Sequence, residues 1–463
     1  MHLEQFYLAC LSQASYVVAD SGSRRAVVVD PRRDIEEYLE YAAAHGLSIE
    51  LVLLTHVHAD FVPGFSELAA RTGATVAIGA DAPVDFPVRR LADGEWLHLG
   101  EPASGTAIQV IATPGHTPES VTYAVFESAA DPAPSAILTG DTLFLGDVGR
   151  PDLLGASGRT PEDMARELYR SLHTRLLPLP DEVLVYPGHG AGSACGKALS
   201  TDTVSTMGEQ RRSNYALAPM DVERFVHVVT EGLAEPPSYF AAEVALNRAG
   251  HEPLDTSVEP PVMAPAEAVA RAANGWLLLD VRDEQDFAAG HLRGAVNVGL
   301  SGRFAEYAAA ITEPGQAIVL VGSPEQAQEA RLRLARVGLD SVAGAVTDLA
   351  GFAGVPQLVM SASRLTADRA ASAIAAQPDL QVVDVRGAGE HADGALPGAV
   401  NLPLPRLLSV LDRIDPRRPV LVHCAGGYRS SAASSLLRAR GYRDVTDLIG
   451  GYTAWSERSP VSR

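Results

Sequence analysis

The sequence has few cysteines and no long apolar segment. Three cysteines, Cys10, Cys195 and Cys424, are spread over 463 residues, which is too few for a disulfide framework and indicates a reducing compartment. No run of about 18 apolar residues is present, so no membrane-spanning helix is expected. The N-terminus also lacks the basic and apolar pattern of a signal peptide. We therefore expect a cytoplasmic protein without a membrane partner.

Basic residues are scarce relative to acidic ones. With 37 Lys and Arg against 57 Asp and Glu, the formal net charge is −20. A protein of this charge repels nucleic acid and anionic membranes, so nucleic acid is not expected as a partner. A small anionic substrate is still compatible with this charge, because its association depends on the local field at a cleft.

An internal repeat organises the C-terminal part of the chain. The segment DVRDEQDFAAGHLRGAVNVGL at 280–300 aligns with DVRGAGEHADGALPGAVNLPL at 384–404, which indicates two copies of one domain. In each copy short apolar strands alternate with helix-like stretches, as in a parallel α/β sheet. Proline-rich joints near 260 and 360 place the domains at 1–258, 259–358 and 359–463.

Before residue 260, polar side chains follow several short apolar strands, in the motifs THVHAD, PGHT, TGD and PGHG. These side chains are His56, His58, Asp60, His116, Asp141 and His189. A single histidine is usually an ordinary core or surface residue. Four histidines and two carboxylates at strand-to-loop junctions are instead expected to converge on one edge of a sheet, as the ligands and supports of a metal ion do.

These motifs resemble those of the metallo-β-lactamase superfamily, which implies an αββα sandwich for the N-terminal domain. The family pattern T-H-x-H-x-D-H breaks at its last position, where this chain has Phe61. In hydrolases with two zinc ions that histidine helps hold the second metal, so its replacement argues against a metal pair. The departure resembles the persulfide dioxygenases of the superfamily, which hold one non-haem iron.

The resemblance implies one Fe(II) per chain. The implied iron ligands are His56, His116 and Asp141. The residues implied to support these ligands are His58, Asp60 and His189. Arg150 and Asp152 of the segment GRPDL are implied to lie beside the site. Two imidazoles and one carboxylate on one face of iron leave positions open for O₂ and a sulfur substrate. The open alternative is that His58 also ligates and that the site holds a single zinc ion.

Cys195 lies in the glycine-rich segment GHGAGSACGK, directly after His189. A free cysteine is usually a small hydrophobic residue. The backbone amides of this loop and Lys197 would instead favour a thiolate or an anionic ligand. Cys195 is therefore a candidate substrate-binding residue, together with Arg150 and Asp152, whereas Cys10 is expected only to pack.

The second copy of the repeat contains HCAGGYRSS, in which Cys424 and Arg429 bracket four residues just before a helix-like stretch. Such a loop turns its amides toward the sulfur, and the helix N-terminus adds positive potential. The repeat resembles rhodanese, which implies a rhodanese-like α/β domain for each copy and makes Cys424 and Arg429 catalytic. The first copy has GSPEQAQEA at the equivalent place and no cysteine, so we expect a structural or docking domain there.

The order of the three domains resembles that of persulfide dioxygenase-sulfurtransferase fusions that serve sulfide detoxification. The resemblance implies that O₂ oxidises a small thiol persulfide to sulfite and thiol, while Cys424 moves sulfane sulfur between persulfide, sulfite and thiosulfate. A homo-oligomer is expected. Two alternatives stay open: a glyoxalase-II-like zinc thioester hydrolase fused to a sulfurtransferase, and a non-enzymatic sulfur carrier.

Overall fold

The computed structural model describes residues 1–153, 158–233 and 235–458. The chain divides into two compact units, one made of Met1–Pro236 and Phe240–Asp255 and the other of Pro237–Tyr239 and Thr256–Arg463. The second unit contains both copies of the sequence repeat.

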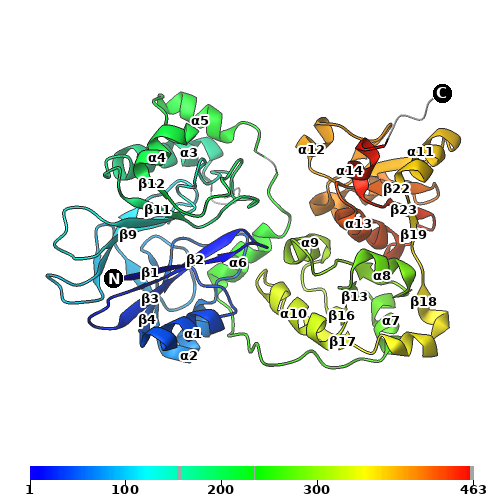
Figure 1. Ribbon diagram of the computed structural model, residues 1–463, viewed down its shortest axis with the longest axis horizontal. Helices are drawn as coiled ribbons and strands as arrows, with labels where there is room; N and C mark the ends of the chain where they lie inside the picture. Colours follow the sequence, from blue (N-terminus) through cyan, green and yellow to red (C-terminus); the bar gives the residue numbers. More distant parts are fainter. Residues whose placement is uncertain (154–157, 234, 459–463) are drawn as a thin grey trace. The chain divides into compact units, whose positions relative to one another are not determined.

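The first unit is built on two six-stranded sheets that pack face to face (Figure 1). One has the order β1-β2-β3-β4-β5-β6, with strands His2–Leu8, Gln13–Ala19, Arg25–Val29, Ser48–Leu54, Thr75–Gly79 and Arg89–Leu91. The other has the order β12-β11-β10-β9-β8-β7, in which β7 to β12 are Trp96–His98, Ala107–Ala112, Val121–Phe126, Ala136–Gly140, Leu184–Pro187 and Ser205–Thr206. Alternate side chains of both sheets, among them Val27, Leu53 and Leu138, point into one shared apolar core.

Helices cover the outer face of each sheet. The first sheet carries α1 (Glu36–His45) and α2 (Phe65–Thr72). The second carries α3 (Pro161–Ser171), η1 (Leu172–Leu176), α4 (Met207–Ser213), η2 (Tyr215–Leu217) and α5 (Val222–Thr230). These layers form the αββα sandwich that the sequence predicts (Figure 1). A further helix, α6 (Phe240–Ala249), brings Asn247 to the main chain of the first histidine motif, where its amide donates to the carbonyls of His58 and Phe61.

The first copy of the repeat folds around a parallel sheet with the order β15-β13-β16-β17. Its strands β13 to β18 are Leu277–Asp280, His291–Leu292, Val296–Asn297, Ile318–Val321, Val342–Val346 and Val359–Met360. Its helices are α7 (Pro265–Ala273), α8 (Glu284–Ala289), α9 (Phe304–Ile311), α10 (Pro324–Ala335), η3 (Ala350–Gly354) and η4 (Pro356–Leu358). The alternation of strands and helices confirms the α/β class expected from the sequence.

The second copy repeats this plan with a parallel sheet of order β19-β23-β22-β20-β21. Its strands β19 to β23 are Ser363–Leu365, Gln381–Asp384, Val400–Asn401, Val420–His423 and Val445–Leu448. Its helices are α11 (Ala367–Ala376), α12 (Ala388–Ala392), η5 (Leu404–Arg413), α13 (Tyr428–Ala439) and α14 (Gly451–Ser456).

The repeated DVR and GAVN motifs hold each copy together. In the second copy the guanidinium of Arg386 donates to both oxygens of Asp384 at 2.7 to 3.1 Å, and Asn401 Nδ2 donates to the carbonyls of Asp384 and Arg386 at 3.1 and 2.8 Å. The equivalent contacts of the first copy join Asp280, Arg282 and Asn297. The repeat therefore reflects a shared scaffold, because these side chains satisfy buried polar groups of their own copy.

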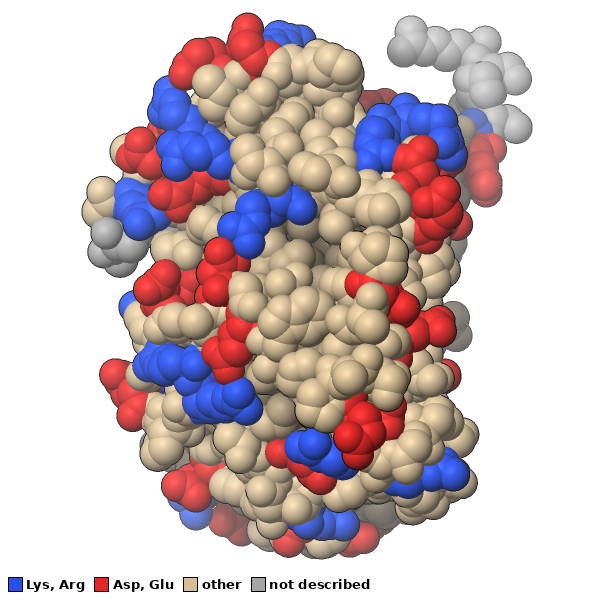
Figure 2. Space-filling model, turned by 90° about the vertical axis from the view of Figure 1, so that its left-hand side faces the viewer, with Lys and Arg blue, Asp and Glu red and all other residues tan. Residues whose placement is uncertain are grey.

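Charged side chains of both signs are mixed on the surface shown in Figure 2, with an uncharged band between them. An extended basic surface of the kind that binds a polyanion is not seen on this face. Among the helices of the described ranges, none is both long and apolar enough to cross a membrane.

The DVR and GAVN contacts predict a measurable stability effect for Asn401→Ala. The substitution removes the donor that two main-chain carbonyls share, so it should lower the free energy of unfolding by about 1–3 kcal/mol. Thermal and urea unfolding should show this loss, whereas Val400→Ala, at a neighbouring side chain that is 46% exposed, should change stability by less than about 0.5 kcal/mol. Equal stabilities of the two variants would contradict the bonding role of Asn401.

Candidate metal centre and sulfur-transfer loop

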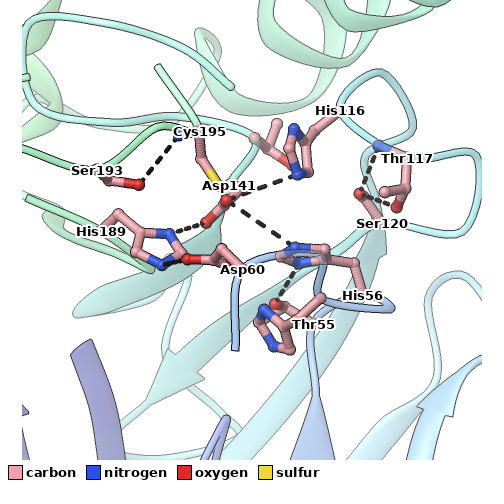
Figure 3. Close-up of polar contacts among 12 residues, drawn as sticks. Thr55, His56, Asp60, His116, Thr117, Ser120, Asp141, His189, Ser193 and Cys195 are labelled. Atoms are coloured by element: carbon pink, nitrogen blue, oxygen red, sulfur yellow. Dashed lines mark hydrogen bonds and ion pairs between the residues drawn. The ribbon is translucent and has the colours of Figure 1, made fainter. Parts of the chain in front are cut away.

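Three side chains from separate loops meet at one buried point of the sandwich. His56 follows β4, His116 lies between β8 and β9, and Asp141 follows β10. Their ligand atoms lie within 4.8 Å of one another, and all three residues are buried. Figure 3 shows both imidazoles turned toward the Asp141 carboxylate. The structure therefore brings together the three residues that the sequence predicts as iron ligands.

The atoms at this point fit a bound cation. His56 Nε2 and His116 Nε2 lie 3.9 and 3.5 Å from Asp141 Oδ2. Within the described part of the chain, His56 Nε2 and Asp141 Oδ2 have no hydrogen-bond partner although both are buried. Buried polar atoms without a partner are costly, and a metal ion would satisfy them together. Burial also lowers the pKa of His56 well below its usual value and lowers that of His116, which favours the neutral imidazoles that bind metals.

The opposite nitrogen of each imidazole is anchored in the protein. His56 Nδ1 lies 2.9 Å from Thr55 Oγ1, and His116 Nδ1 donates to the carbonyl of Arg150 at 2.9 Å. Such contacts fix the ring orientation and leave Nε2 facing the metal position. Arg150 thus lies beside the site, where its main-chain carbonyl holds His116.

His189 orients the Asp141 carboxylate. His189 Nδ1 donates to Asp141 Oδ1 at 2.8 Å, and His189 Nε2 lies 2.7 Å from Asp60 Oδ2. Burial alone would lower the pKa of His189, but the two carboxylates raise it well above its usual value. The two carboxylates thus favour the protonated form of His189, and His189 bridges Asp60 and Asp141, as a residue that supports a metal ligand would.

His58 is held by a carboxylate that the sequence analysis did not single out. His58 Nε2 lies 2.9 Å from Asp30 Oδ1, and Asp30 also accepts from Thr55 N and Thr55 Oγ1 at 2.9 and 2.8 Å. Burial opposes protonation, but Asp30 raises the pKa of His58. Asp30 directly follows the apolar strand β3, and this position at the end of a strand is the sequence feature that could have indicated its role at the site. His58 Nδ1 has no partner in the described ranges, and a zinc site with a third imidazole would use that atom.

Phe61 is buried between two of these histidines. Its ring centroid lies 4.4 Å from that of His58 and 6.5 Å from that of His189. Ligand atoms of Asp60, His189 and Cys195 also lie within 4.8 Å of one another nearby. Phe61 thus packs against His58 and near His189, and its ring offers no ligand atom to a second metal.

Cys195 lies next to the ligands, but its environment differs from the expected one. Its side chain is 1% exposed, and its sulfur points toward the Asp141 carboxylate (Figure 3). Burial, followed by Asp60 and Asp141, raises the pKa of the Cys195 thiol well above its usual value. Lys197 turns away to the carbonyls of Val228 and Glu231. The expectation that this loop favours a thiolate is therefore wrong, because burial and two carboxylates outweigh the loop amides.

The loop of Cys195 is tied to the segment that anchors His116. Arg150 N donates to the carbonyl of Cys195 at 2.9 Å, and Arg150 Nη1 donates to the carbonyl of Ala194 at 3.1 Å. The same guanidinium binds both oxygens of Asp152 at 2.6 and 2.8 Å. Arg150 and Asp152 thus form an ion pair beside the metal position, and this pair holds the Cys195 loop.

The second candidate centre is the loop between β22 and α13. Gly427 has a φ of 106°, which favours glycine, and its N–H donates to Cys424 Sγ at 3.1 Å. Ser430 Oγ lies 3.6 Å from the same sulfur. Arg429 Nη1 and Nη2 bind Glu390 of α12 at 2.7 and 2.8 Å. Arg429 therefore joins the loop to α12, and Glu390 is a partner that the sequence analysis missed.

The equivalent loop of the first copy is filled by its own side chains. Ser323 Oγ accepts from Gln326 N at 3.2 Å, and Gln326 Oε1 accepts from Ser323 N at 2.8 Å. This reciprocal cap uses amides that would otherwise face a bound group. The arrangement fits the expected structural or docking role of the first copy.

Comparisons with known proteins agree with this architecture. Residues 8–189 match the metallo-beta-lactamase superfamily, and residues 264–353 and 366–458 each match the rhodanese-like domain. The chain is 33% identical over 259 residues to the beta-lactamase hydrolase-like protein of Agrobacterium fabrum, and the alignment covers 49% of this chain and 55% of that protein. It thus spans about half the length of the curated relatives that it matches first.

Two further relatives are informative. The chain is 29% identical over 245 residues to the persulfide dioxygenase ETHE1 of Bos taurus, which covers 51% of this chain and 84% of that protein. A solved structure of a metallo-beta-lactamase from Staphylococcus aureus is 28% identical, covers 75% of this chain and 98% of that chain, and has a TM-score of 0.66.

The position of Phe61 predicts that Phe61→His gains metal. A new imidazole beside Asp60 and His189 would be buried without a partner unless a metal binds it. Metal analysis after dialysis against zinc should show additional zinc in this variant, and zinc should raise its melting temperature. Phe61→Leu is the matched control, because leucine offers no ligand. Equal zinc content in both variants would mean that other features close the second site.

Proposed function

The chain belongs to the metallo-beta-lactamase superfamily and carries two rhodanese-like domains, and we propose on this basis that it is a persulfide dioxygenase coupled to a sulfurtransferase. The observation that carries the proposal is the buried trio of His56, His116 and Asp141, together with Phe61, which packs on His58 and offers no ligand to a second metal. The likeness to the bovine persulfide dioxygenase supports it.

The proposed first reaction converts a small thiol persulfide, O₂ and water into the thiol, sulfite and two protons. Iron bound by two histidines and one carboxylate would supply the redox chemistry that reduces O₂ and oxidises the outer sulfur atom. The proposed partners are therefore a small thiol persulfide, O₂, sulfite and thiosulfate.

The surrounding residues hold this site in one arrangement. His189 binds Oδ1 of Asp141, so Oδ2 is the oxygen left to face His56 and His116. The protonated thiol of Cys195 and the Arg150–Asp152 pair lie beside it, where we propose that they contact the substrate. Burial of the ligands excludes water and strengthens these polar contacts.

The proposed second reaction takes place at Cys424. The outer sulfur of a Cys424 persulfide bonds to the sulfur of sulfite, the bond to Sγ breaks, and the proton of the outer sulfur passes to Sγ, which yields thiosulfate and a free thiol. The Gly427 amide, which donates to Sγ, would stabilise the leaving sulfur as it gains negative charge.

A zinc thioester hydrolase is the second candidate. The name of the Agrobacterium fabrum relative indicates a hydrolase, and His58 Nδ1 has no partner in the described ranges. A hydrolase of this kind would hold zinc and would consume no O₂, so oxygen uptake separates the two candidates.

The dioxygenase proposal predicts that His116→Ala abolishes oxygen uptake. Wild type should bind about one iron per chain and consume O₂ when given a thiol persulfide. The variant lacks an iron ligand, so uptake on an oxygen electrode should fall more than about 100-fold. The exposed His227 offers a control, since His227→Ala should behave as wild type. Stoichiometric zinc without oxygen uptake in the wild type would contradict the proposal. If folded His116→Ala also lost the transfer of sulfur from thiosulfate to a thiol, the two reactions would not take place at separate sites.

The coupling of the two reactions predicts a change of products in Cys424→Ser. Serine has nearly the same size but cannot carry sulfane sulfur. Wild type given persulfide and O₂ should yield thiosulfate, whereas the variant should consume O₂ normally and accumulate sulfite. Chromatography of both products, corrected for the spontaneous reaction of sulfite with persulfide, measures this difference. Matching yields from the two proteins would show that the activities are not coupled.

A further inference from the structure

The copy of the repeat without a cysteine packs on the helix that carries the Cys424 loop. Helix α9 contacts α13 (Figure 1). Ser431 Oγ donates to Asn297 Oδ1 at 2.7 Å, Asn297 N donates to Ser435 Oγ at 2.9 Å, and the hydroxyl of Tyr428 donates to the carbonyl of Gly299. The first copy therefore contacts the loop side of α13 through buried polar groups.

Tyr307 extends this contact toward the Cys424 loop. It belongs to α9, and its ring centroid lies 5.7 Å from that of Tyr428, which immediately precedes Arg429. Burial raises the pKa of Tyr307. The charges of Arg429 and Arg303 act in the opposite direction, and those of Glu306 and Cys424 raise this pKa further. Tyr307 of the first copy therefore packs on the residue of the Cys424 loop that comes directly before Arg429.

The hydroxyl of Tyr307 differs from that of Tyr428 in having no hydrogen-bond partner among the residues that the structure describes. In the described part of the chain no hydrogen bond of this hydroxyl is found, whereas Tyr428 donates to Gly299. The two nearest cations are already paired, Arg429 with Glu390 and Arg303 with Glu306. The phenol is therefore a donor next to the Cys424 loop that a ligand can use without breaking an ion pair.

We propose that Tyr307 donates a hydrogen bond to the oxyanion that exchanges sulfur with Cys424, so that the first copy completes the sulfurtransferase site. This inference rests on the proposed function of Cys424. Sulfite and the outer group of thiosulfate carry three oxygen atoms that accept hydrogen bonds, whereas a thiol persulfide has none at its reacting sulfur. Tyr307 thereby determines specificity for the oxyanion and has no part in accepting sulfur from a persulfide.

The test compares Tyr307→Phe with Tyr442→Phe in the full-length protein. Both substitutions remove one phenolic oxygen, but Tyr442 donates to the carbonyls of Leu411 and Ile414. Steady-state transfer from thiosulfate to a thiol gives kcat and KM, and rapid mixing with glutathione persulfide gives the rate of persulfide formation on Cys424. Tyr307→Phe should raise KM for thiosulfate and sulfite about tenfold, as expected for one hydrogen bond to a charged group. It should leave persulfide loading unchanged, and Tyr442→Phe should alter neither.

The outcomes separate this inference from the proposed function. If wild type transfers no sulfur from thiosulfate, or if Cys424→Ser transfers as well as wild type, the sulfurtransferase proposal itself fails. If Cys424→Ser is inactive but Tyr307→Phe keeps the wild-type KM for both oxyanions, only the role of Tyr307 is refuted. An equal loss of oxyanion transfer and persulfide loading in Tyr307→Phe would likewise refute it, since that pattern indicates packing against Tyr428.

Discussion

The candidate metal centre depends on the hydrogen bond between His189 and Asp141. This bond occupies Oδ1 of the carboxylate and leaves Oδ2 facing His56 and His116. Asp141 and Asp60 on the two sides of the ring raise the pKa of His189, and protonation of the ring strengthens its bond to a carboxylate. Removing Asp60 would therefore weaken the hold on His189 and, through it, the orientation of the Asp141 carboxylate. A single buried chain of Asp60, His189 and Asp141 thus prepares the site for one cation.

The rhodanese-like copies show how one scaffold serves two purposes. The pairs of Asp280 with Arg282 and of Asp384 with Arg386 are bound in the same way, so both copies keep the contacts that shape the sheet. They differ in the loop after β16 of the first copy and β22 of the second. The first has a reciprocal cap at Ser323, and the second has a cysteine that accepts a hydrogen bond from a glycine amide. The first copy packs on α13 through Asn297 and Gly299, and Tyr307 lies against Tyr428 of the Cys424 loop.

Much of this arrangement could be predicted from the sequence because the signals are local. An apolar run followed by a polar residue predicts a strand that ends at a site, and this holds for His56 and Asp141. Contacts between distant segments carry no such signal. Asp30 binds His58 from 28 positions away, Glu390 binds Arg429 from 39 positions away, and Tyr307 lies in another copy of the repeat. The thiolate expected at Cys195 failed for the same reason, since the carboxylates that raise its pKa come from other loops.

The central claim is that His56, His116 and Asp141 hold one iron with positions open to O₂ and substrate. Electron paramagnetic resonance of the nitric oxide adduct tests it directly, because nitric oxide binds an open position of Fe(II) and gives a characteristic half-integer spin signal. The claim predicts about one such spin per chain, a change of the signal when thiol is added, and its loss in Asp141→Ala. A protein as purified that contains zinc and gives no signal after anaerobic addition of Fe(II) and nitric oxide would contradict it.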